Sequence, residues 1–460
     1  MNEHISSPQI SRRSLLRGGA AAAALAAGLP LPSRAAGRPR PTGIASSGIA
    51  NARVSHDHYG VHVGPSLAAN PRHPRQLLAA CQAAPTGNPN VIATYLSRDA
   101  GATWRSGGQL SHPADKPPAG DDVTVAFDPH GRGYVSATGT GGSDADRTMY
   151  AWRTDDGGRS FSAPVILVTG GQYFDQPWIS AGAGQSPSER NVYVVWASNQ
   201  HEGGDSVSMS RSTDGGQSFE PPRTILDAHR NTTQSATPKV VAGAHGLVCV
   251  VADELSQWDS SGDLVGHAVA VCSTDAGNSF SAPVQLGWET LNIRLPGDVL
   301  PNLGVMVAAA PHGDALYVAF NRHQRGANHA DIAVRASYDH GRTWSQPVTA
   351  TPDDSVTYFQ PNLAVDEAGR VAISAFALAD GRIDEVLLLS PPHQLRFGAP
   401  LRVTTASFDP HSPTATGQKH GAWWIGDYQG ITASGGAFHL VWNETRTGKM
   451  ELFAATVATG

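Results

Sequence analysis

Carboxylates and aromatic rings occur side by side in short polar segments between runs of apolar residues. Asp175 follows Phe174, Asp427 precedes Tyr428, and Asp122 opens a third such segment. A sugar stacks its apolar face on aromatic rings, and its hydroxyl groups hydrogen-bond to charged side chains. A glycoside hydrolase of the common kind needs two carboxyl groups beside one glycosidic bond, so Asp122 with either Asp175 or Asp427 is a candidate pair.

An eight-residue motif that recurs five times indicates the elements that position these side chains. Its copies read SRDAGATW, TDDGGRSF, STDGGQSF, STDAGNSF and SYDHGRTW, and they begin at residues 97, 154, 212, 273 and 337. In a tight turn a short carboxylate accepts backbone N–H groups, and glycine supplies the positive φ. We therefore expect a structural role for the aspartates of the motif. They are Asp99, Asp156, Asp214, Asp275 and Asp339.

A second pattern occurs seven times: an apolar strand that ends in a small or Gly-containing turn. It opens each predicted unit of the chain, whether or not the unit carries the eight-residue motif. Units of about 60 residues with three or four short strands and no helical periodicity are typical of radial blades. The sequence therefore predicts an all-β fold, a single β-propeller of four-stranded blades over residues 44–460. Seven blades are favoured, and six are the alternative.

The last predicted unit, from about Asp427 to Gly460, has room for only three strands. Residues 44–55 are expected to supply its missing outer strand. N-terminal and C-terminal strands would then close the ring and remove the open sheet edge.

The N-terminus predicts export. Arg12 and Arg13 precede an apolar run over 20–31 and a small-residue cleavage site that ends at Ala35. This order is typical of a twin-arginine signal peptide, here residues 1–35, and residues 36–43 are expected to be a linker. The apolar run is shorter than the roughly 20 residues that cross a bilayer, so we expect no stable membrane anchor. The mature protein is expected to be secreted or periplasmic.

Replacing Arg12 and Arg13 together with lysine is expected to leave unprocessed precursor in the cytoplasm, because the export pathway reads the arginine pair. Immunoblots of cytoplasmic and exported fractions measure the outcome. The matched control is Arg17→Lys, which alters an arginine outside the pair and should export normally. Normal export of the double variant would contradict the prediction.

The charge of the chain makes nucleic acid an unlikely partner. The net charge is -6, and the first 43 residues hold six arginines against one glutamate, so the remainder is more acidic still. No Lys/Arg cluster supplies the positive surface that phosphate backbones require. We expect a monomer whose partner is an extracellular glycan or protein.

Few cofactor signals are present. His56, Asp57, His58 and His62 match no zinc spacing, and no phosphate-binding loop or nucleophile elbow occurs, so neither metal nor cofactor is expected. Three cysteines cannot form a disulfide framework. Two of them, Cys249 and Cys272, fall on neighbouring predicted strands. They either pair in an oxidising compartment or stay buried and free.

The repeated motif resembles the Asp box, or bacterial neuraminidase repeat, of the sialidase superfamily of propellers, from about residue 60 onward. That superfamily holds sialidases, other glycosidases and proteins that bind without cleaving. Sialidases carry an early F-R-I-P-type motif with an arginine, whereas the segment YGVHVGPSL here has none. The resemblance thus implies a secreted propeller that binds glycan or protein ligands through its central funnel without catalysis. The alternative is an exo-acting glycosidase of the exo-α-sialidase type that hydrolyses terminal sugars.

A sialidase mechanism needs an acid/base and a tyrosine nucleophile with a glutamate partner, and the placement of residues on predicted loops offers three candidates for these roles. Asp122 would be the acid/base, and Tyr428, partnered by Glu444, would be the nucleophile, since sialidases are the exception that uses tyrosine. The residues expected to contact the substrate are Arg294, Arg322, Arg446, Asp175, Tyr358 and Asp427. The three arginines among them would hold the substrate carboxylate.

Overall fold

The computed structural model describes most of the chain after residue 47. The described residues are 48–86, 90–141, 146–170, 173–182, 184–186, 188–201, 204–227, 237–258, 264–291, 295–300, 304–311, 313, 315–323, 329–352, 355–411, 418–419 and 422–459. The predicted signal peptide and linker lie outside these ranges, as does Arg294. Among the residues described, there is no helix with the length and hydropathy needed to span a membrane.

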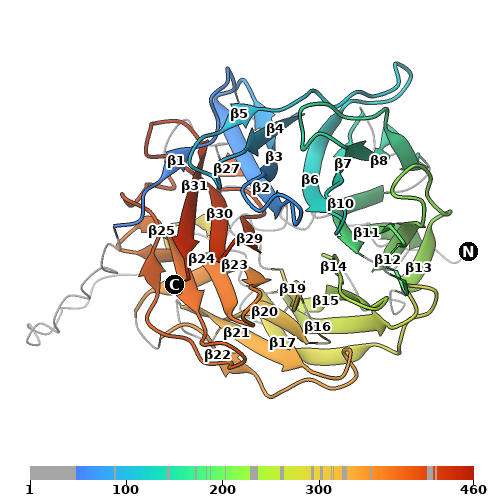
Figure 1. The fold of residues 1–460 in the computed structure, drawn as a ribbon. Helices are drawn as coiled ribbons and strands as arrows, with labels where there is room; N and C mark the ends of the chain where they lie inside the picture. Colours follow the sequence, from blue (N-terminus) through green and yellow to red (C-terminus); the bar gives the residue numbers. More distant parts are fainter. Residues whose placement is uncertain are drawn as a thin grey trace, which may run out of the picture.

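Seven four-stranded antiparallel sheets stand around a central axis as the blades of a propeller (Figure 1). All regular elements of the described residues are strands. The predicted all-β fold and the favoured count of seven blades are thus confirmed. In six blades the four strands follow one another along the chain from the axis outward.

The first three blades occupy the N-terminal half of the chain. Blade 1 comprises β2 (Val61–Ala69), β3 (Leu77–Ala84), β4 (Val91–Ser97) and β5 (Arg105–Ser106). Blade 2 comprises β6 (Ala119–Phe127), β7 (Gly133–Gly139), β8 (Thr148–Thr154) and β9 (Val165–Thr169). Blade 3 comprises β10 (Tyr173–Gly182), β11 (Asn191–His201), β12 (Gly204–Ser212) and β13 (Arg223–Leu226).

The next three blades repeat the same order. Blade 4 comprises β14 (Lys239–Ala242), β15 (Val248–Trp258), β16 (Leu264–Ser273) and β17 (Val284–Leu291). Blade 5 comprises β19 (Met306–Ala309), β20 (Leu316–His323), β21 (Ala330–Ser337) and β22 (Val348–Thr349). Blade 6 comprises β23 (Thr357–Val365), β24 (Val371–Ala379), β25 (Arg382–Leu389) and β26 (Leu401–Arg402).

Blade 7 joins the two ends of the described chain. It comprises β29 (Gly430–Ser434), β30 (Ala437–Glu444), β31 (Glu451–Ala458) and β1 (Ala52–Arg53). β1 pairs with β31 in antiparallel register, so the predicted closure is confirmed. A separate three-stranded sheet consists of β18 (Val299–Leu300), β27 (Gln418–Lys419) and β28 (Ala422–Trp424).

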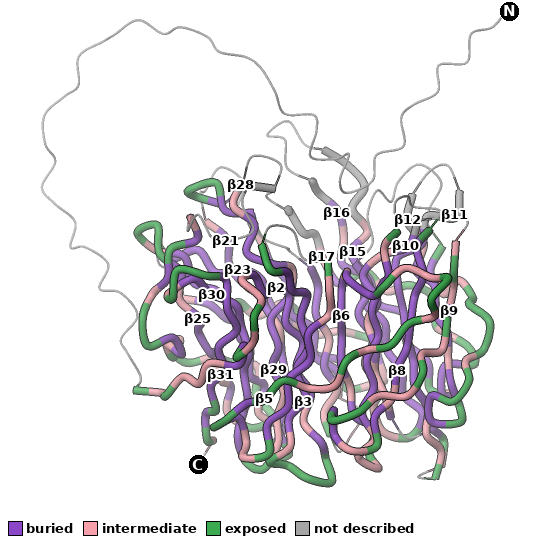
Figure 2. The backbone as a smooth tube through the Cα atoms, turned by 90° about the horizontal axis from the view of Figure 1, so that it is seen from above, coloured by how far each residue is buried: buried purple, intermediate pink, exposed green. Residues whose placement is uncertain are grey.

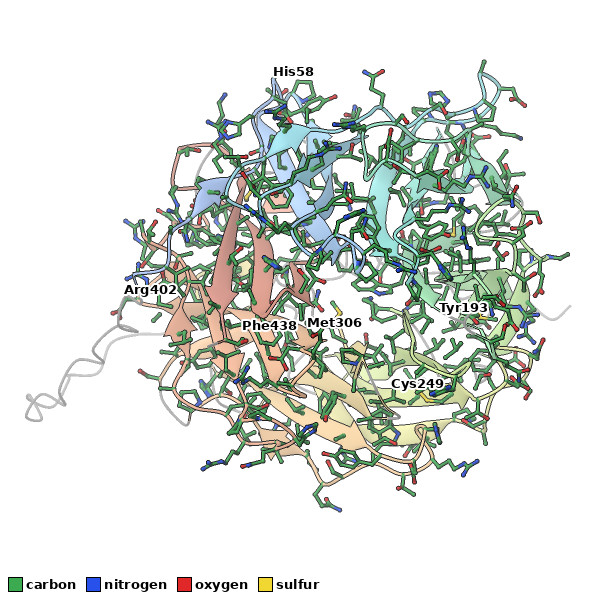
Figure 3. The ribbon with its side chains drawn as sticks, in the orientation of Figure 1. His58, Tyr193, Cys249, Met306, Arg402 and Phe438 are labelled. Atoms are coloured by element: carbon green, nitrogen blue, oxygen red, sulfur yellow. A yellow bond between two sulfur atoms is a disulfide. The ribbon has the colours of Figure 1, made fainter. Side chains whose placement is uncertain are left out.

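Apolar side chains fill the spaces between neighbouring blades. The described residues form seven hydrophobic clusters; five join two adjacent blades, and the other two centre on blade 6 and reach further residues near the axis. Tyr193 packs between blades 3 and 4, and Cys249 between blades 4 and 5 (Figure 3). Because a blade is covered on both faces, its strands read as continuous apolar runs, such as VAISAFALA in β24. Figure 2 shows this burial along the strands, with exposed residues concentrated at the two rims.

The two rims have different loops. The loops that join first to second strands and third to fourth strands lie on one face, here called the turn face. The loops that join second to third strands, together with the connections between blades, lie on the other, here called the crossover face. The first strand of each blade therefore begins at the crossover face and ends at the turn face.

Two of the three cysteines are paired. Cys249 on β15 and Cys272 on β16 are opposite each other in the strand register and form a disulfide. Cys81 on β3 is free and buried.

The five copies of the repeated motif form nearly identical turns on the turn face. In blade 3, Asp214 Oδ1 accepts the N–H groups of Gln217 and Ser218 at 2.9 and 3.0 Å, and Oδ2 accepts the Ser218 hydroxyl at 2.6 Å. The Gly216 N–H donates to Ser212 Oγ at 2.8 Å, and its φ of 78° favours glycine. Partial burial opposes ionisation of Asp214, but these hydrogen bonds hold its pKa at about 2.

Replacing Asp214 with alanine is expected to lower the free energy of unfolding by roughly 1–3 kcal/mol, because the turn loses the acceptor of two N–H groups. Urea denaturation measures the change. The matched control is Asp227→Ala, which removes an exposed carboxylate and should change stability little. Wild-type stability of the Asp214 variant would contradict the structural role.

Candidate active site

Four of the innermost strands carry a bulge near the crossover face. The residues in the left-handed region there are Gly64, Asp122, Gln176 and Gln360, with φ of 60°, 36°, 56° and 54°. Each falls at a shift in the strand register, and proline follows Gly64, Gln176 and Gln360 directly. A bulge redirects side chains, and left-handed non-glycine residues cluster at functional sites. The bulges thus indicate that a functional site lies at this end of the inner strands.

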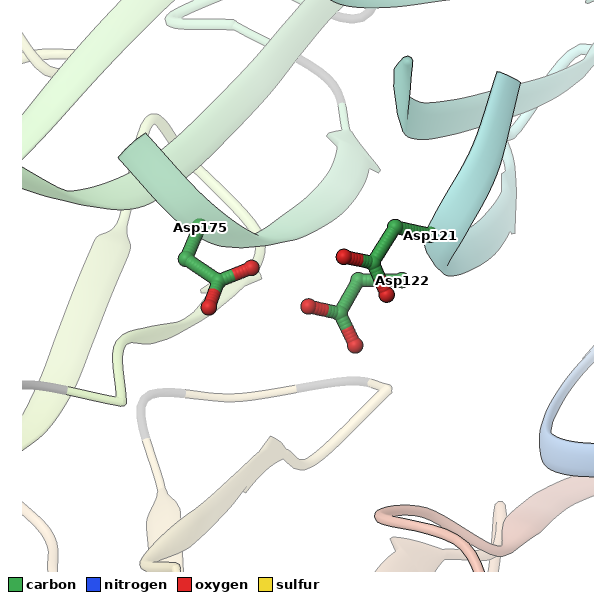
Figure 4. A group of neighbouring side chains, drawn as sticks. All are labelled: Asp121, Asp122 and Asp175. Atoms are coloured by element: carbon green, nitrogen blue, oxygen red, sulfur yellow. The ribbon is translucent and has the colours of Figure 1, made fainter. Parts of the chain in front are cut away.

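Three carboxylates meet at the inner edge of blades 2 and 3. Asp121 and Asp122 on β6 and Asp175 on β10 each offer an oxygen, and these oxygens lie within 4.8 Å of one another (Figure 4). We call this group the inner carboxylate cluster. It joins the two members of one predicted pair, Asp122 and Asp175, and adds Asp121.

Asp122 is the most buried member of the cluster, with 4 % of its surface exposed. Gln82 Nε2 donates to its Oδ1, and the Gln176 N–H donates to its Oδ2, both at 3.2 Å. Burial raises the pKa of Asp122 well above its usual range, and the charges of Asp175 and Asp121 raise it further. The raised pKa favours the protonated form of Asp122, which hydrogen-bonds to Asp175.

Asp175 has a cation beside it. Arg147 Nη1 lies 3.6 Å from Asp175 Oδ1 and donates to the Phe174 carbonyl at 3.0 Å, with only 4 % of the arginine side chain exposed. A guanidinium at this distance favours the charged form of the carboxylate. The pair thus combines a carboxyl whose pKa is raised with a carboxylate beside a guanidinium, two different environments of the kind that acid–base chemistry uses.

Oxygen ligands of this kind also suit hard divalent cations. Here the Arg147 guanidinium beside Asp175 already offsets part of the negative charge of the cluster.

Side chains from three blades meet near the axis. The rings of Trp178 on β10 and Tyr428, which precedes β29, have centroids 5.6 Å apart at an edge-to-face angle. Lys239 Nζ at the start of β14 lies 4.9 Å from the Trp178 centroid and 5.2 Å from that of Tyr428. Tyr428 and Lys239 are each 1 % exposed. This cation–π group is part of the packed centre of the ring.

Glu444, the predicted partner of Tyr428, lies in a different environment. It is buried at the end of β30, accepts Trp442 Nε1 at 2.7 Å and pairs with Arg446. The Arg446 guanidinium lies 4.5 Å from the centroid of Phe453. Among the described residues, Glu444 and Arg446 thus bind each other within blade 7, and Glu444 makes no hydrogen bond to Tyr428.

The remaining predicted residues fall in three places. Arg322 on β20 makes a two-pronged ion pair with Asp331 at 2.9 Å for both bonds. Tyr358 is fully buried in the cluster between blades 5 and 6. Asp427 accepts Trp424 Nε1 at 3.0 Å, and its charge contributes to the raised pKa of Asp122. Neither Arg322 nor Arg446 is a free cation for a substrate carboxylate in the part of the chain described.

The sequence reasoning missed Arg147, Lys239 and Gln82. The bulges of the inner strands did have a signal in the sequence. Proline near the start of several inner strands, as in Gln176–Pro177, indicates a bulge, since proline cannot donate to the ladder. Arg147 lies just before β8 and had no comparable signal.

Comparisons with known proteins give a fold and no family. No family model matches the sequence, and no curated protein matches it. Among solved structures, an α-L-arabinanase of Penicillium chrysogenum complexed with arabinobiose is 10 % identical, with a TM-score of 0.50 over 88 % of this chain and 96 % of that one. An ulvan lyase is 12 % identical, with a TM-score of 0.50 over 87 % and 96 %. A Hadza microbial sialidase is 13 % identical, with a TM-score of 0.48 over 83 % and 76 %. At these identities the likeness concerns the propeller fold alone.

Proposed function

We propose that the protein is a glycoside hydrolase in which Asp122 and Asp175 form the acid–base pair. The observation that carries this proposal is the buried Asp122, with a raised pKa, hydrogen-bonded to Asp175 beside Arg147. A general acid must hold its proton at the working pH, and burial among other carboxylates is how proteins achieve this.

Each carboxyl has a defined part in the proposed reaction. Asp122 gives its proton to the glycosidic oxygen as the bond to the anomeric carbon breaks. Asp175 attacks that carbon as the nucleophile, and Asp122, now ionised, takes a proton from the water that releases the sugar. The oxygens lie within 4.8 Å of one another, which is too close for the water between the carboxyl groups of an inverting enzyme, where the separation is roughly 6.5–9.5 Å. We therefore expect retention of the anomeric configuration. A substrate must first break the hydrogen bond between Asp122 and Asp175 and enter between them.

The charge around the pair favours a neutral sugar. Asp121, Asp175 and Asp427 all act on Asp122 as negative charges, and a carboxylated substrate such as a sialoside would be repelled. Arg322 and Arg446 are engaged with carboxylates of the chain itself. The arabinobiose in the Penicillium chrysogenum structure is a neutral disaccharide, so arabino-oligosaccharides are the first substrates to test. A secreted enzyme would meet such glycans outside the cell, in line with the expected export.

Glycan binding without catalysis is the second candidate. Asp122 is 4 % exposed, so a substrate would have to reach a carboxyl that its neighbours almost cover. A protein that only binds would use the partly exposed Asp121, Asp175 and Asp427 as acceptors for sugar hydroxyls.

A substrate panel separates these possibilities. The purified protein is incubated with arabino-oligosaccharides, other neutral oligosaccharides and an aryl sialoside, and products are followed by chromatography and proton NMR. The proposal expects cleavage of a neutral substrate with retention. Binding by calorimetry without cleavage would favour the second candidate.

Tyr428→Phe distinguishes the paired carboxylates from a sialidase mechanism. The proposal expects turnover within about tenfold of wild type, because loss of one buried hydroxyl costs roughly 1 kcal/mol. The opposite result would be a wild type that cleaves the aryl sialoside and a Phe variant whose turnover is lower by several orders of magnitude. That result would identify Tyr428 as the nucleophile and contradict the proposal.

A further inference from the structure

A groove of about 730 Å³ opens between blades 1 and 2. Its walls come from the β2–β3 and β6–β7 loops and from the repeated turns after β4 and β8, all of which lie on the turn face. β6 carries Asp122 near its beginning and leads into His130 and Gly131 beyond its end. The groove and the inner carboxylate cluster therefore lie at opposite ends of the same strand.

The groove is rich in exposed arginine. Arg72 and Arg75 come from the β2–β3 loop, Arg98 from the turn of blade 1 and Arg159 from the turn of blade 2. Within the described residues, the side chains of Arg75, Arg98 and Arg159 make no hydrogen bond or ion pair. Four guanidinium groups around one groove, in a chain of net charge -6, form a local positive field.

The acidic side chains of the groove are already engaged. Asp155 pairs with Arg132 at 2.6 Å. The Asp156 carboxylate accepts the Ser160 hydroxyl and N–H within its own turn, at 2.7 and 3.0 Å. Asp156 keeps its charge, so the four arginines of the lining outnumber the one carboxylate there that lacks an ion pair, and the groove stays positive.

The floor of the groove is built from buried polar groups. Asn70, 3 % exposed, donates to Gln76 Oε1 at 2.6 Å and to the Gly131 carbonyl at 3.3 Å, which ties blade 1 to blade 2. Arg72 Nε donates to the Pro129 carbonyl across the groove at 3.2 Å, which holds this guanidinium in place. Gly157 has a φ of 73°, which favours glycine, and a Cβ there would displace the Gln76 side chain, whose Nε2 is 1.7 Å away. The groove is thus a preformed feature and not a chance gap between side chains.

We infer that this groove binds a short acidic oligosaccharide through its carboxylate or sulfate groups. Arginine matches the planar oxygens of these groups with two parallel hydrogen bonds. The volume lies within the roughly 300–1,000 Å³ of ligand sites and suits a few sugar rings. Among the described residues that line the groove there is no Phe, Tyr or Trp to stack a nucleobase, and the acidic chain repels a long polyanion. This site is independent of the proposed hydrolase site, which favours neutral sugars.

The test is calorimetry at low salt with four probes: a chondroitin sulfate tetrasaccharide, trigalacturonate, maltotriose and sodium sulfate. The inference expects the first two to bind and maltotriose not to bind. Arg98→Gln with Arg159→Gln should weaken binding by about tenfold for each arginine, since each loses a charged hydrogen bond. The matched control is Arg342→Gln, which alters the exposed arginine at the position of Arg159 in the turn of blade 5 and should leave binding unchanged.

Three results would overturn the inference: equal binding of maltotriose, binding of sodium sulfate alone, or an Arg98/Arg159 double variant with wild-type affinity. Asp122→Asn separates this site from the proposed hydrolase. The substitution should leave affinity for the tetrasaccharide unchanged, whether or not the protein cleaves neutral glycans.

Discussion

Asp122→Asn is expected to lower kcat/KM for a neutral glycoside with a poor leaving group by roughly 10²–10⁴-fold, because the amide cannot give a proton to the departing oxygen. The fold is expected to survive, since the Asn carbonyl can still accept the Gln176 N–H and the Gln82 amide can turn to accept from the Asn NH2 group. Steady-state kinetics with an alkyl glycoside measure the loss. An activated dinitrophenyl glycoside, which needs no acid, should lose far less.

The pH profile gives a second readout of the same group. Because the reaction needs protonated Asp122, kcat/KM of the wild type should fall as pH rises through the raised pKa of this carboxyl. Asp227→Asn, at an exposed carboxylate on blade 3, is the control for a change of charge alone. Equal losses of the Asp122 variant on both leaving groups would remove Asp122 from the role of acid.

Glu385→Met is expected to raise the free energy of unfolding at pH 7.5 by about 2 kcal/mol or more, because it removes an unpartnered buried carboxyl. Glu385 lies on β25, 1 % exposed, opposite Phe376 and between Ile383 and Leu387 on the same strand face. All three neighbours belong to the cluster between blades 6 and 7. Neither Glu385 oxygen has a hydrogen-bond partner among the described residues. Methionine has a similar volume and no charge.

The sign of the pH dependence follows from the direction of the shift. Burial raises the pKa of Glu385 well above the 4.5 of an exposed glutamate. The folded state therefore keeps a proton that the unfolded chain releases, and the free energy of unfolding falls as pH rises from about 4.5 toward the folded pKa. Denaturation curves at pH 5 and pH 7.5 should show that the Met variant gains more at the higher pH.

Glu385→Gln is the matched control for the Met variant. It removes the ionisation but leaves a polar group in the apolar cluster, so it should flatten the pH dependence with a smaller gain in stability. A Met variant that is no more stable than wild type at either pH would show that Glu385 has a partner in solution.

The fold was predictable because its signals are local. Turn aspartates and glycines repeat about every 60 residues, and each copy fixes a hairpin within eight residues. The pairing of Cys249 with Cys272 was not predictable, because a shift of one residue in the register would point one of the side chains to the other face of the sheet.

The site was predictable only in part. Asp122 and Asp175 lie within β6 and β10 near the beginnings of these inner strands, and their meeting depends on bulges that turn the side chains. Glu444 ends β30 and Arg446 follows it, yet the two bind each other within blade 7. Loop position gives the rim on which a residue lies, whereas strand register and bulges decide where its side chain points.

The pairing of β1 with β31 links folding to translation. Ala52 and Ala454 are partners, so the ring cannot close until almost the whole chain has left the ribosome. Contacts this distant along the chain form slowly, and blade 7 keeps an open strand edge, prone to aggregation, until they do. An export route that accepts folded cargo would let the ring close in the cytoplasm before the protein meets the membrane.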